Sequence, residues 1–190
     1  MTSHPIPLPL RAGRTHEAQG PGARVFAAVI GAQTGGDVLW IRPRHADGQV
    51  MPDGLAAFFP PARLLVAQGA GERDLLWMAE EALRSGAVGL VVAELTKPLG
   101  LTAGRRLQLA AEAGRVTGLC LVREGAGCNA AETRWQCRPH PGDSTLQHWS
   151  LKKNKTGILG DWLVLWDDKA RRIDVVSPPG ERAGSASASG

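Results

Sequence analysis

Three lysines beside a tryptophan are the residues best suited to phosphate chemistry. Trp149, Lys152, Lys153, Asn154 and Lys155 lie together at the end of an extended stretch. Ammonium groups attract phosphates, and a tryptophan ring offers a face on which a base can stack. We therefore predict that these five residues contact nucleic acid. The alternatives are a solvated hairpin turn for the lysines and a core position for Trp149.

A glycine loop that runs into a predicted helix is the second candidate, because backbone N–H groups at a helix start can bind an anion. Gly20 and Gly22 flank Pro21 in this loop. A phosphate loop of the Walker A type needs a lysine and then Ser or Thr after its last glycine, whereas Ala23 and Arg24 follow here. We expect a vestigial phosphate loop that binds no nucleotide, and we expect no cofactor.

Other catalytic and metal-binding patterns are weak. Glu94 ends a predicted strand, where a carboxylate could orient Mg²⁺, but without the lysine we interpret it as an ordinary strand end. Cys120, Cys128 and Cys137 are an odd number without CxxC spacing. No serine lies in a GxSxG turn. The sequence therefore predicts a protein that is not an enzyme, with no catalytic residue and no metal site.

The composition is that of a globular domain. The 190 residues are 43% hydrophobic and 21% charged. The net charge of +4 permits an anionic partner without requiring one. No run of 18 apolar residues occurs, and the first residues lack the basic and apolar regions of a secretory signal. We expect a cytoplasmic protein that does not contact membranes.

Apolar patterns predict alternating helices and strands. Helices are expected over 23–32, 74–84 and 102–114, and buried strands at 38–41, 64–66, 88–93 and 118–122. Strand-helix alternation predicts a doubly wound α/β sheet with ligands at the carboxyl ends of its strands. Extended runs at 133–138, 147–152, 161–167 and 172–177 predict C-terminal antiparallel hairpins that close the sheet.

The tryptophans and the middle helix give expectations about the core. Over 74–84, the spacing predicts that Leu75, Met78, Ala82 and Leu83 are buried, and we place Trp77 in the core as well. Trp162 and Trp166 should share one buried face of a strand. Proline-rich and small-residue compositions predict a flexible tail over 1–15 and a disordered tail over 178–190, leaving 16–177 as one domain.

Several segments together resemble the ImuA-type mutagenesis proteins, which are degenerate RecA-like proteins of bacterial SOS operons. The resemblance covers about residues 15–168 and depends on the order and spacing of its segments. These are His16-Glu17, Gly20 to Ala23, 38–41, 74–84, 105–113, 133–135 and 160–164. In addition, Lys153-Asn154-Lys155 is similar to the Lys-Asn-Lys stretch that follows the DNA-binding loops of RecA recombinases.

The resemblance implies a RecA-like sheet flanked by helices and an accessory role in damage-induced, error-prone translesion synthesis. It implies as partners an inactive Y-family polymerase homologue of the ImuB type and an error-prone replicative-type polymerase, with a RecA filament or single-stranded DNA as further contacts. The missing Walker lysine and hydroxyl put ATP hydrolysis in doubt. Two alternatives remain open: a SulA-like inhibitor of cell division, and a weak ATPase with a non-standard phosphate loop.

Overall fold

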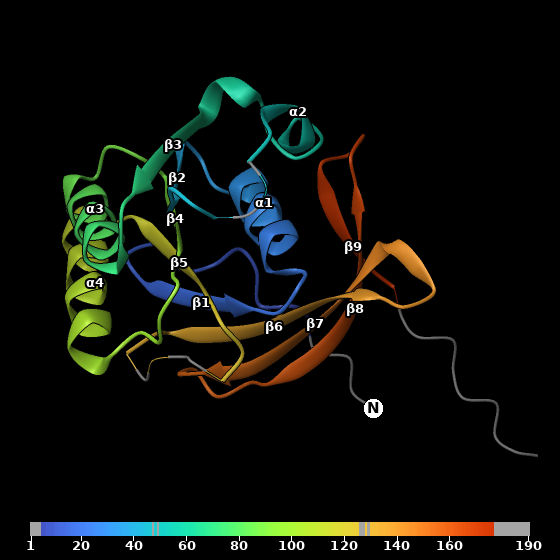
Figure 1. Cartoon of the computed structure of the whole chain (residues 1–190). Helices are drawn as coiled ribbons and strands as arrows, with labels where there is room; N and C mark the ends of the chain where they lie inside the picture. The colour runs from blue at the N-terminus through green and yellow to red at the C-terminus, as the bar shows by residue number, and fades with distance from the viewer. Residues whose placement is uncertain (1–4, 47, 49, 126–127, 129, 177–190) are drawn as a thin grey trace, which may run out of the picture.

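A single mixed sheet forms the centre of the protein in a computed structural model that describes residues 5–176, apart from 47, 49, 126–127 and 129 (Figure 1). Its strands lie in the order β3-β2-β4-β5-β1-β6-β7-β8-β9. The pairs from β3 to β6 are parallel, and those from β6 to β9 are antiparallel. The strands are β1 (Thr15–Gln19), β2 (Val38–Pro43), β3 (Leu64–Gly69), β4 (Leu90–Glu94), β5 (Thr117–Val122), β6 (Thr133–His140), β7 (Asp143–Asn154), β8 (Gly160–Asp167) and β9 (Arg172–Val176).

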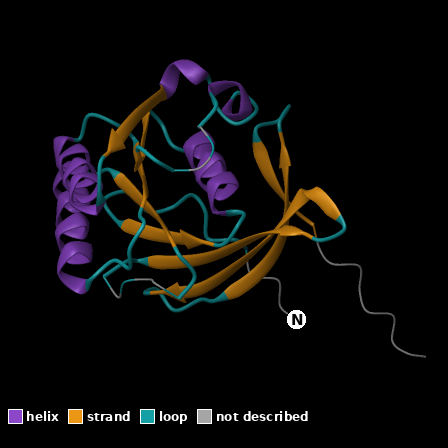
Figure 2. Cartoon of the chain, viewed as in Figure 1, coloured by secondary structure: helices purple, strands orange, loops and turns teal. Residues whose placement is uncertain are grey.

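Helices cover both faces of the parallel part of the sheet (Figure 2). On one face lies α1 (Ala23–Gln33), and on the other lie α3 (Glu72–Ser85) and α4 (Leu101–Gly114) side by side. The short α2 (Pro52–Leu55) and a 3₁₀ turn (Pro61–Arg63) connect β2 to β3. The sheet therefore separates two hydrophobic clusters, one under α1 and one under α3 and α4.

The predicted α/β class, the parallel strands and the C-terminal hairpins are confirmed. The alternation of apolar runs placed all three long helices within two residues of their ends in the structure. Gly86 ends α3 in the left-handed conformation, with φ of 69°, as expected of a glycine after a helix. The hairpin strands curl around the α1 face, where Phe26 packs on Trp135 and Trp149 with ring centroids 5.2 and 4.8 Å apart.

The central strand β1 was not expected. Its residues are Thr15, His16, Glu17, Ala18 and Gln19, and all five are buried between β5 and β6. A buried parallel strand normally consists of consecutive apolar residues. Here each polar side chain bonds to a neighbouring element instead, so that its burial is tolerated.

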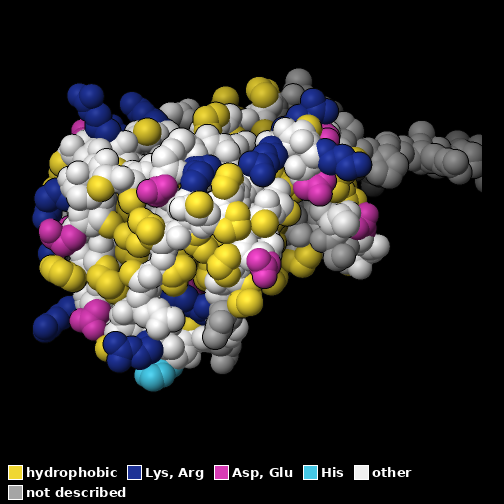
Figure 3. All heavy atoms as spheres, turned by 90° about the horizontal axis from the view of Figure 1, so that it is seen from above, with side chains coloured by type: hydrophobic (Ala, Val, Ile, Leu, Met, Phe, Trp, Pro, Cys, Tyr) yellow, Lys and Arg dark blue, Asp and Glu magenta, His cyan; other side chains and the backbone are white. Residues whose placement is uncertain are grey.

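Strand β3 lies at the edge of the sheet and is not covered on both faces as expected. Leu65 and Val66 are each 46% exposed because β3 pairs only with β2. On the face that carries β3 and α2, hydrophobic side chains lie among charged ones (Figure 3). An apolar run of this length does not tell an edge strand from a central one.

Two predictions about helix α3 need correction. Leu75 and Leu83 are buried as expected, whereas Met78 and Ala82 are only partly covered. Trp77 is 62% exposed and does not lie in the core. Its position is about 200° around the helix from Leu75, which faces the sheet. Trp77 therefore faces away from the sheet.

The C-terminal strands return to the α1 face. Trp162 is buried, and Trp166 stacks on Phe58 at 5.2 Å and donates its indole N–H to the carbonyl of Ala57 at 3.0 Å. The two tryptophans thus pack on the same cluster as predicted, with Trp162 buried and Trp166 only partly buried. No helix in the described part of the chain is long and apolar enough to cross a membrane.

The segment before β1 packs on the body of the protein. Leu10 is buried, and Ile6 and Leu8 pack on the cluster under α1, although a flexible tail over 1–15 was expected. The expected C-terminal tail, 178–190, lies outside the described residues. The division of the chain at residues 16 and 177 stays a prediction.

Candidate functional site

The loop between β1 and α1 occupies the phosphate-loop position, but its glycines contact the neighbouring strand. Gly20 has φ of 91°, and a Cβ placed there would lie 2.5 Å from the carbonyl oxygen of Cys137. Gly22 donates its N–H to that same carbonyl at 3.0 Å, and Ala23 donates its N–H to Gly20 at 3.1 Å. These two N–H groups are therefore already used within the protein and do not face a free anion site.

Arg24 and Glu94 form an ion pair beside this loop. The Nε and Nη2 atoms of Arg24 lie 3.1 and 2.9 Å from the two carboxylate oxygens of Glu94. The indole N–H of the buried Trp40 donates to Oε1 of Glu94 at 2.8 Å, and Nη2 of Arg42 lies 3.9 Å from Oε2. Glu94 ends β4 as predicted, and its carboxylate is contacted by two arginines and a tryptophan.

A hollow of about 350 Å³ lies at the carboxyl ends of β1, β4 and β5, which is where an α/β sheet normally binds its ligand. Its lining residues include Gly20, Pro21, Arg24, Glu94 and Arg123. Within this hollow Arg24 places its positive charge against the carboxylate of Glu94.

The five residues predicted to bind nucleic acid have different surroundings. The ring of Trp149 is 1% exposed and packs edge-on against Phe26, so it has no open face for a base. Lys152 is half-exposed, and its Nζ lies 3.8 Å from Asp161. Asn154 accepts hydrogen bonds from the backbone and hydroxyl of Thr156 and so shapes the turn.

The other two lysines bind backbone carbonyls between β5 and β6. Lys153 donates to the carbonyl of Ala131 at 2.7 Å, and Lys155 donates to that of Ala130 at 2.8 Å. Partial burial, and then the charges of Lys155 and Arg134, lower the pKa of Lys153. The lysine segment therefore holds the β5–β6 connection in place, and its contact with nucleic acid stays a prediction.

A buried ion pair in the middle of the sheet was missed by sequence reasoning. Glu17, 1% exposed, accepts the Nε–H of Arg134 at 2.7 Å and the backbone N–H of Cys128 at 2.6 Å. Arg134 also donates to the carbonyl of Cys128 at 3.0 Å. His16-Glu17 and Thr133-Arg134 were both parts of the resemblance, but their pairing depends on β1 and β6 being neighbours, which the sequence did not predict.

His16 lies at the start of the same strand in a defined protonation state. Its Nε2 faces the carbonyl of Arg11 at 3.1 Å, and its Nδ1 faces the hydroxyl of Thr133 at 2.8 Å. A carbonyl can only accept, so Nε2 carries the proton and Nδ1 accepts from Thr133. Burial lowers the pKa of His16 to about 4, against the raising effects of the Arg11 carbonyl and Glu132. The ring is therefore neutral and structural.

The three cysteines are buried, and for two of them burial suppresses the reactivity of the thiol. Burial raises the pKa of the thiols of Cys120 and Cys137 well above the ordinary value, and for Cys120 the charges of Glu17 and Cys128 add to this effect. A thiol that stays protonated is a poor nucleophile and a poor metal ligand.

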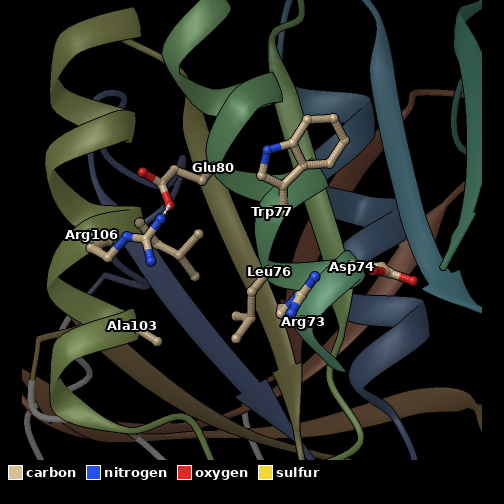
Figure 4. Close-up of a pocket in the computed structure, with 8 residues that line it drawn as sticks. Arg73, Asp74, Leu76, Trp77, Glu80, Ala103 and Arg106 are labelled. Carbon is tan, nitrogen blue, oxygen red and sulfur yellow. Dashed lines mark ion pairs between the residues drawn. The ribbon is translucent and has the colours of Figure 1, made fainter. Parts of the chain in front are cut away.

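A groove between α3 and α4 has the exposed Trp77 among its lining residues (Figure 4). It has a volume of about 470 Å³, and Leu76 and Ala103 form part of its lining. Its charges are of both signs, because Arg73 and Arg106 line it together with Asp74 and Glu80, and Arg106 pairs with Glu80 at 2.6 Å. The groove therefore combines apolar side chains with two positive and two negative ones.

Comparison with known proteins agrees with this architecture. No protein-family model matches the chain. The chain is 35% identical over 150 residues to Protein ImuA from two strains of Caulobacter vibrioides, NA1000 and ATCC 19089. The match covers 68% of this chain and 60% of each relative, so the chain spans about three fifths of their length. The predicted resemblance to ImuA is confirmed.

The fold matches that of a solved recombinase. The crystal structure of the RadB recombinase superposes with a TM-score of 0.67 over 88% of this chain and 92% of that chain, at 14% sequence identity. This likeness establishes the fold, which is the RecA-like fold that the resemblance to ImuA implied.

Proposed function

We propose that the chain is a non-catalytic accessory protein of SOS-induced, error-prone translesion DNA synthesis, acting in the cytoplasm as an adaptor. Its partners in this proposal are an inactive Y-family polymerase homologue of the ImuB type and an error-prone replicative-type polymerase. The similarity to ImuA supports the cellular role. Contact with single-stranded DNA or a RecA filament is a further part of the proposal, with the half-exposed Lys152 as the lysine of the predicted segment to test first.

The ion pair between Arg24 and Glu94 supports the non-catalytic part of the proposal. A nucleotide hydrolase of this type needs a lysine for the phosphates and a carboxylate free to hold Mg²⁺. Here the first two residues after Gly22 are Ala23 and Arg24, and the carboxylate of Glu94 already accepts from Arg24 and Trp40. A nucleotide would have to displace an internal salt bridge before it could bind.

Two experiments test the proposal. Titration calorimetry with ATP and Mg²⁺ should show no binding to the purified chain; saturable binding would favour the weak-ATPase alternative. Deletion of the gene in the bacterium that encodes it should reduce ultraviolet-induced mutation, and the partners should co-purify with the tagged protein. Unchanged mutation frequency, or filamentous growth on overproduction that depends on the cell-division tubulin homologue, would contradict the adaptor role and favour the SulA-like alternative.

A further inference from the structure

The outer flank of α4 carries a hollow of about 500 Å³ at which three parts of the chain meet. These are α4 itself, the β5–β6 connection and the turn between β7 and β8. The lining residues are Leu101, Arg105, Gln108, Leu109, Ala130 and Lys155. The hollow is separate from the groove around Trp77, which lies between α3 and α4.

Two leucines on this flank have largely exposed side chains. Leu101 and Leu109 are 51% and 66% exposed, and together with Arg105 they are spaced by four residues along one side of the helix. The side of α4 that packs against the sheet is already apolar through Leu107, Ala110 and Ala111. An amphipathic helix needs only one such side, so a second apolar side indicates a contact outside the domain.

The flank is also positively charged. Arg105 and Lys155 border the hollow, and no carboxylate is among its lining residues. Within the described part of the chain Arg105 makes no ion pair, whereas Arg106, its neighbour on the other side of α4, pairs with Glu80. A surface with both exposed leucines and positive charges favours a partner that carries apolar side chains close to carboxylates.

We propose that the outer flank of α4 binds an acidic peptide segment of a partner protein, with two apolar side chains that pack on Leu101 and Leu109 and carboxylates that pair with Arg105 and Lys155. Eight residues of helix separate the two leucines by about 12 Å. That distance matches apolar residues two turns apart on a helix, or four residues apart on an extended strand. This inference deepens the adaptor function proposed above and rests on it.

Two other occupants fit less well. Single-stranded nucleic acid binds through aromatic faces beside its cations, and leucine offers none. A second copy of the chain, docked flank to flank, would bring Arg105 and Lys155 of each copy against the same cations of the other. An acidic protein segment satisfies both the apolar and the charged part of the surface.

Selection from a displayed library of 12-residue peptides on the full purified chain tests the proposal. We expect the selected peptides to contain two apolar residues and several carboxylates. Labelled peptides should bind at least tenfold more weakly to Arg105→Glu and Leu109→Ser in anisotropy titrations. Trp77→Ser is the matched control, since it removes an equally exposed apolar side chain from a face of mixed charge, and it should bind as the wild type does. All three variants should melt as the wild type does, because these side chains are largely exposed.

Several results would overturn it. These are a library that yields no binder, binders without carboxylates, or binding that Leu109→Ser leaves unchanged. Competition by a labelled 20-nucleotide single strand, lost in Arg105→Glu, would assign the flank to nucleic acid. Concentration-dependent dimers lost in Leu109→Ser would assign it to a second copy. Peptide selection uses the purified chain alone, so a failed mutagenesis assay with intact peptide binding would reject the SOS role and leave the docking surface standing.

Discussion

Arg24, the second residue of α1, and Glu94, the last residue of β4, are 70 positions apart in the sequence and form a two-point salt bridge. Fork-to-carboxylate geometry is the strongest form of this interaction. Both residues line the hollow at the carboxyl ends of the parallel strands, where an α/β sheet normally binds its ligand, and their charges neutralise each other.

The first prediction concerns the stability that Glu94 contributes. Glu94→Gln keeps an acceptor for the indole of Trp40 but loses the charge, and should lower the free energy of unfolding by about 1–2 kcal/mol. Glu94→Ala also leaves the buried N–H of Trp40 without its acceptor and should cost about 2–4 kcal/mol. Urea denaturation of both variants measures the difference, and equal losses would show that the bond to Trp40 contributes nothing.

The second prediction is that restoring the missing Walker residues does not restore nucleotide binding. Ala23→Lys with Arg24→Thr recreates the Gly-Lys-Thr order, but the N–H of Gly22 still points to Cys137 and position 23 is buried. Calorimetry with ATP and Mg²⁺ should detect no binding, and the double variant should be less stable because Glu94 loses its partner. Micromolar affinity would mean that the loop detaches from β6 readily.

The third prediction is a pH dependence that originates at His16. Its pKa is about 4 in the folded protein and near 6.5 when unfolded, so below pH 6.5 the unfolded chain takes up a proton that the folded one refuses. Stability is therefore lost as the pH falls, by about 2–3 kcal/mol between pH 7.5 and 4.5. His16→Gln, which cannot be protonated, should flatten the denaturation profile over this range. Parallel profiles for the two proteins would contradict a buried neutral ring.

The sequence predicted the elements well wherever a pattern stays local. Periodic leucines and alanines define α3 and α4, and apolar runs define β2, β4 and β5. Strand β1 was invisible to the same criterion, because His16 and Glu17 are acceptable in a buried strand only through partners more than 100 residues away. Leu65 was predicted to be buried but is half-exposed, for a related reason. Whether a strand lies at the edge or in the centre of a sheet depends on the order of the strands and not on the strand's own residues.

The candidate site shows the same division. The departure from a Walker loop at Ala23 and Arg24 could be read directly, whereas the pairing of Arg24 with Glu94 could not. For the lysine segment, the residue types gave the positive charge but not where the side chains point. Lys153 and Lys155 donate hydrogen bonds to the backbone carbonyls of Ala131 and Ala130. A lysine in a turn can satisfy backbone acceptors as easily as phosphates, and only the fold decides between them.

The fourth prediction compares two residues of α3. Leu83 is 2% exposed, so Leu83→Ala should leave a cavity and lower the free energy of unfolding by about 2–5 kcal/mol. Trp77→Ala removes a larger side chain from the surface and should change it by no more than about 0.5 kcal/mol. Thermal and urea denaturation measure both. A large loss in Trp77→Ala would mean that its ring covers more of the groove than its exposure indicates.

The last prediction separates folding from nucleic-acid binding in the lysine segment. Trp149→Ala should lower the free energy of unfolding by about 3–5 kcal/mol, because its ring fills the core beside Phe26.

Lys152→Ala should leave the fold intact, since the side chain is half-exposed and its anionic neighbour, Asp161, lies 3.8 Å away on the surface. If Lys152 contacts a phosphate, the slope of log affinity for single-stranded DNA against log salt becomes shallower by about 0.7 in this variant. Anisotropy titrations at two or more salt concentrations measure that slope, and Lys153→Ala is a poor substitute for this test because it also releases the carbonyls that hold the β5–β6 connection. Equal slopes for wild type and Lys152→Ala would remove this lysine from any nucleic-acid site and leave the segment with the structural role seen at Lys153 and Lys155.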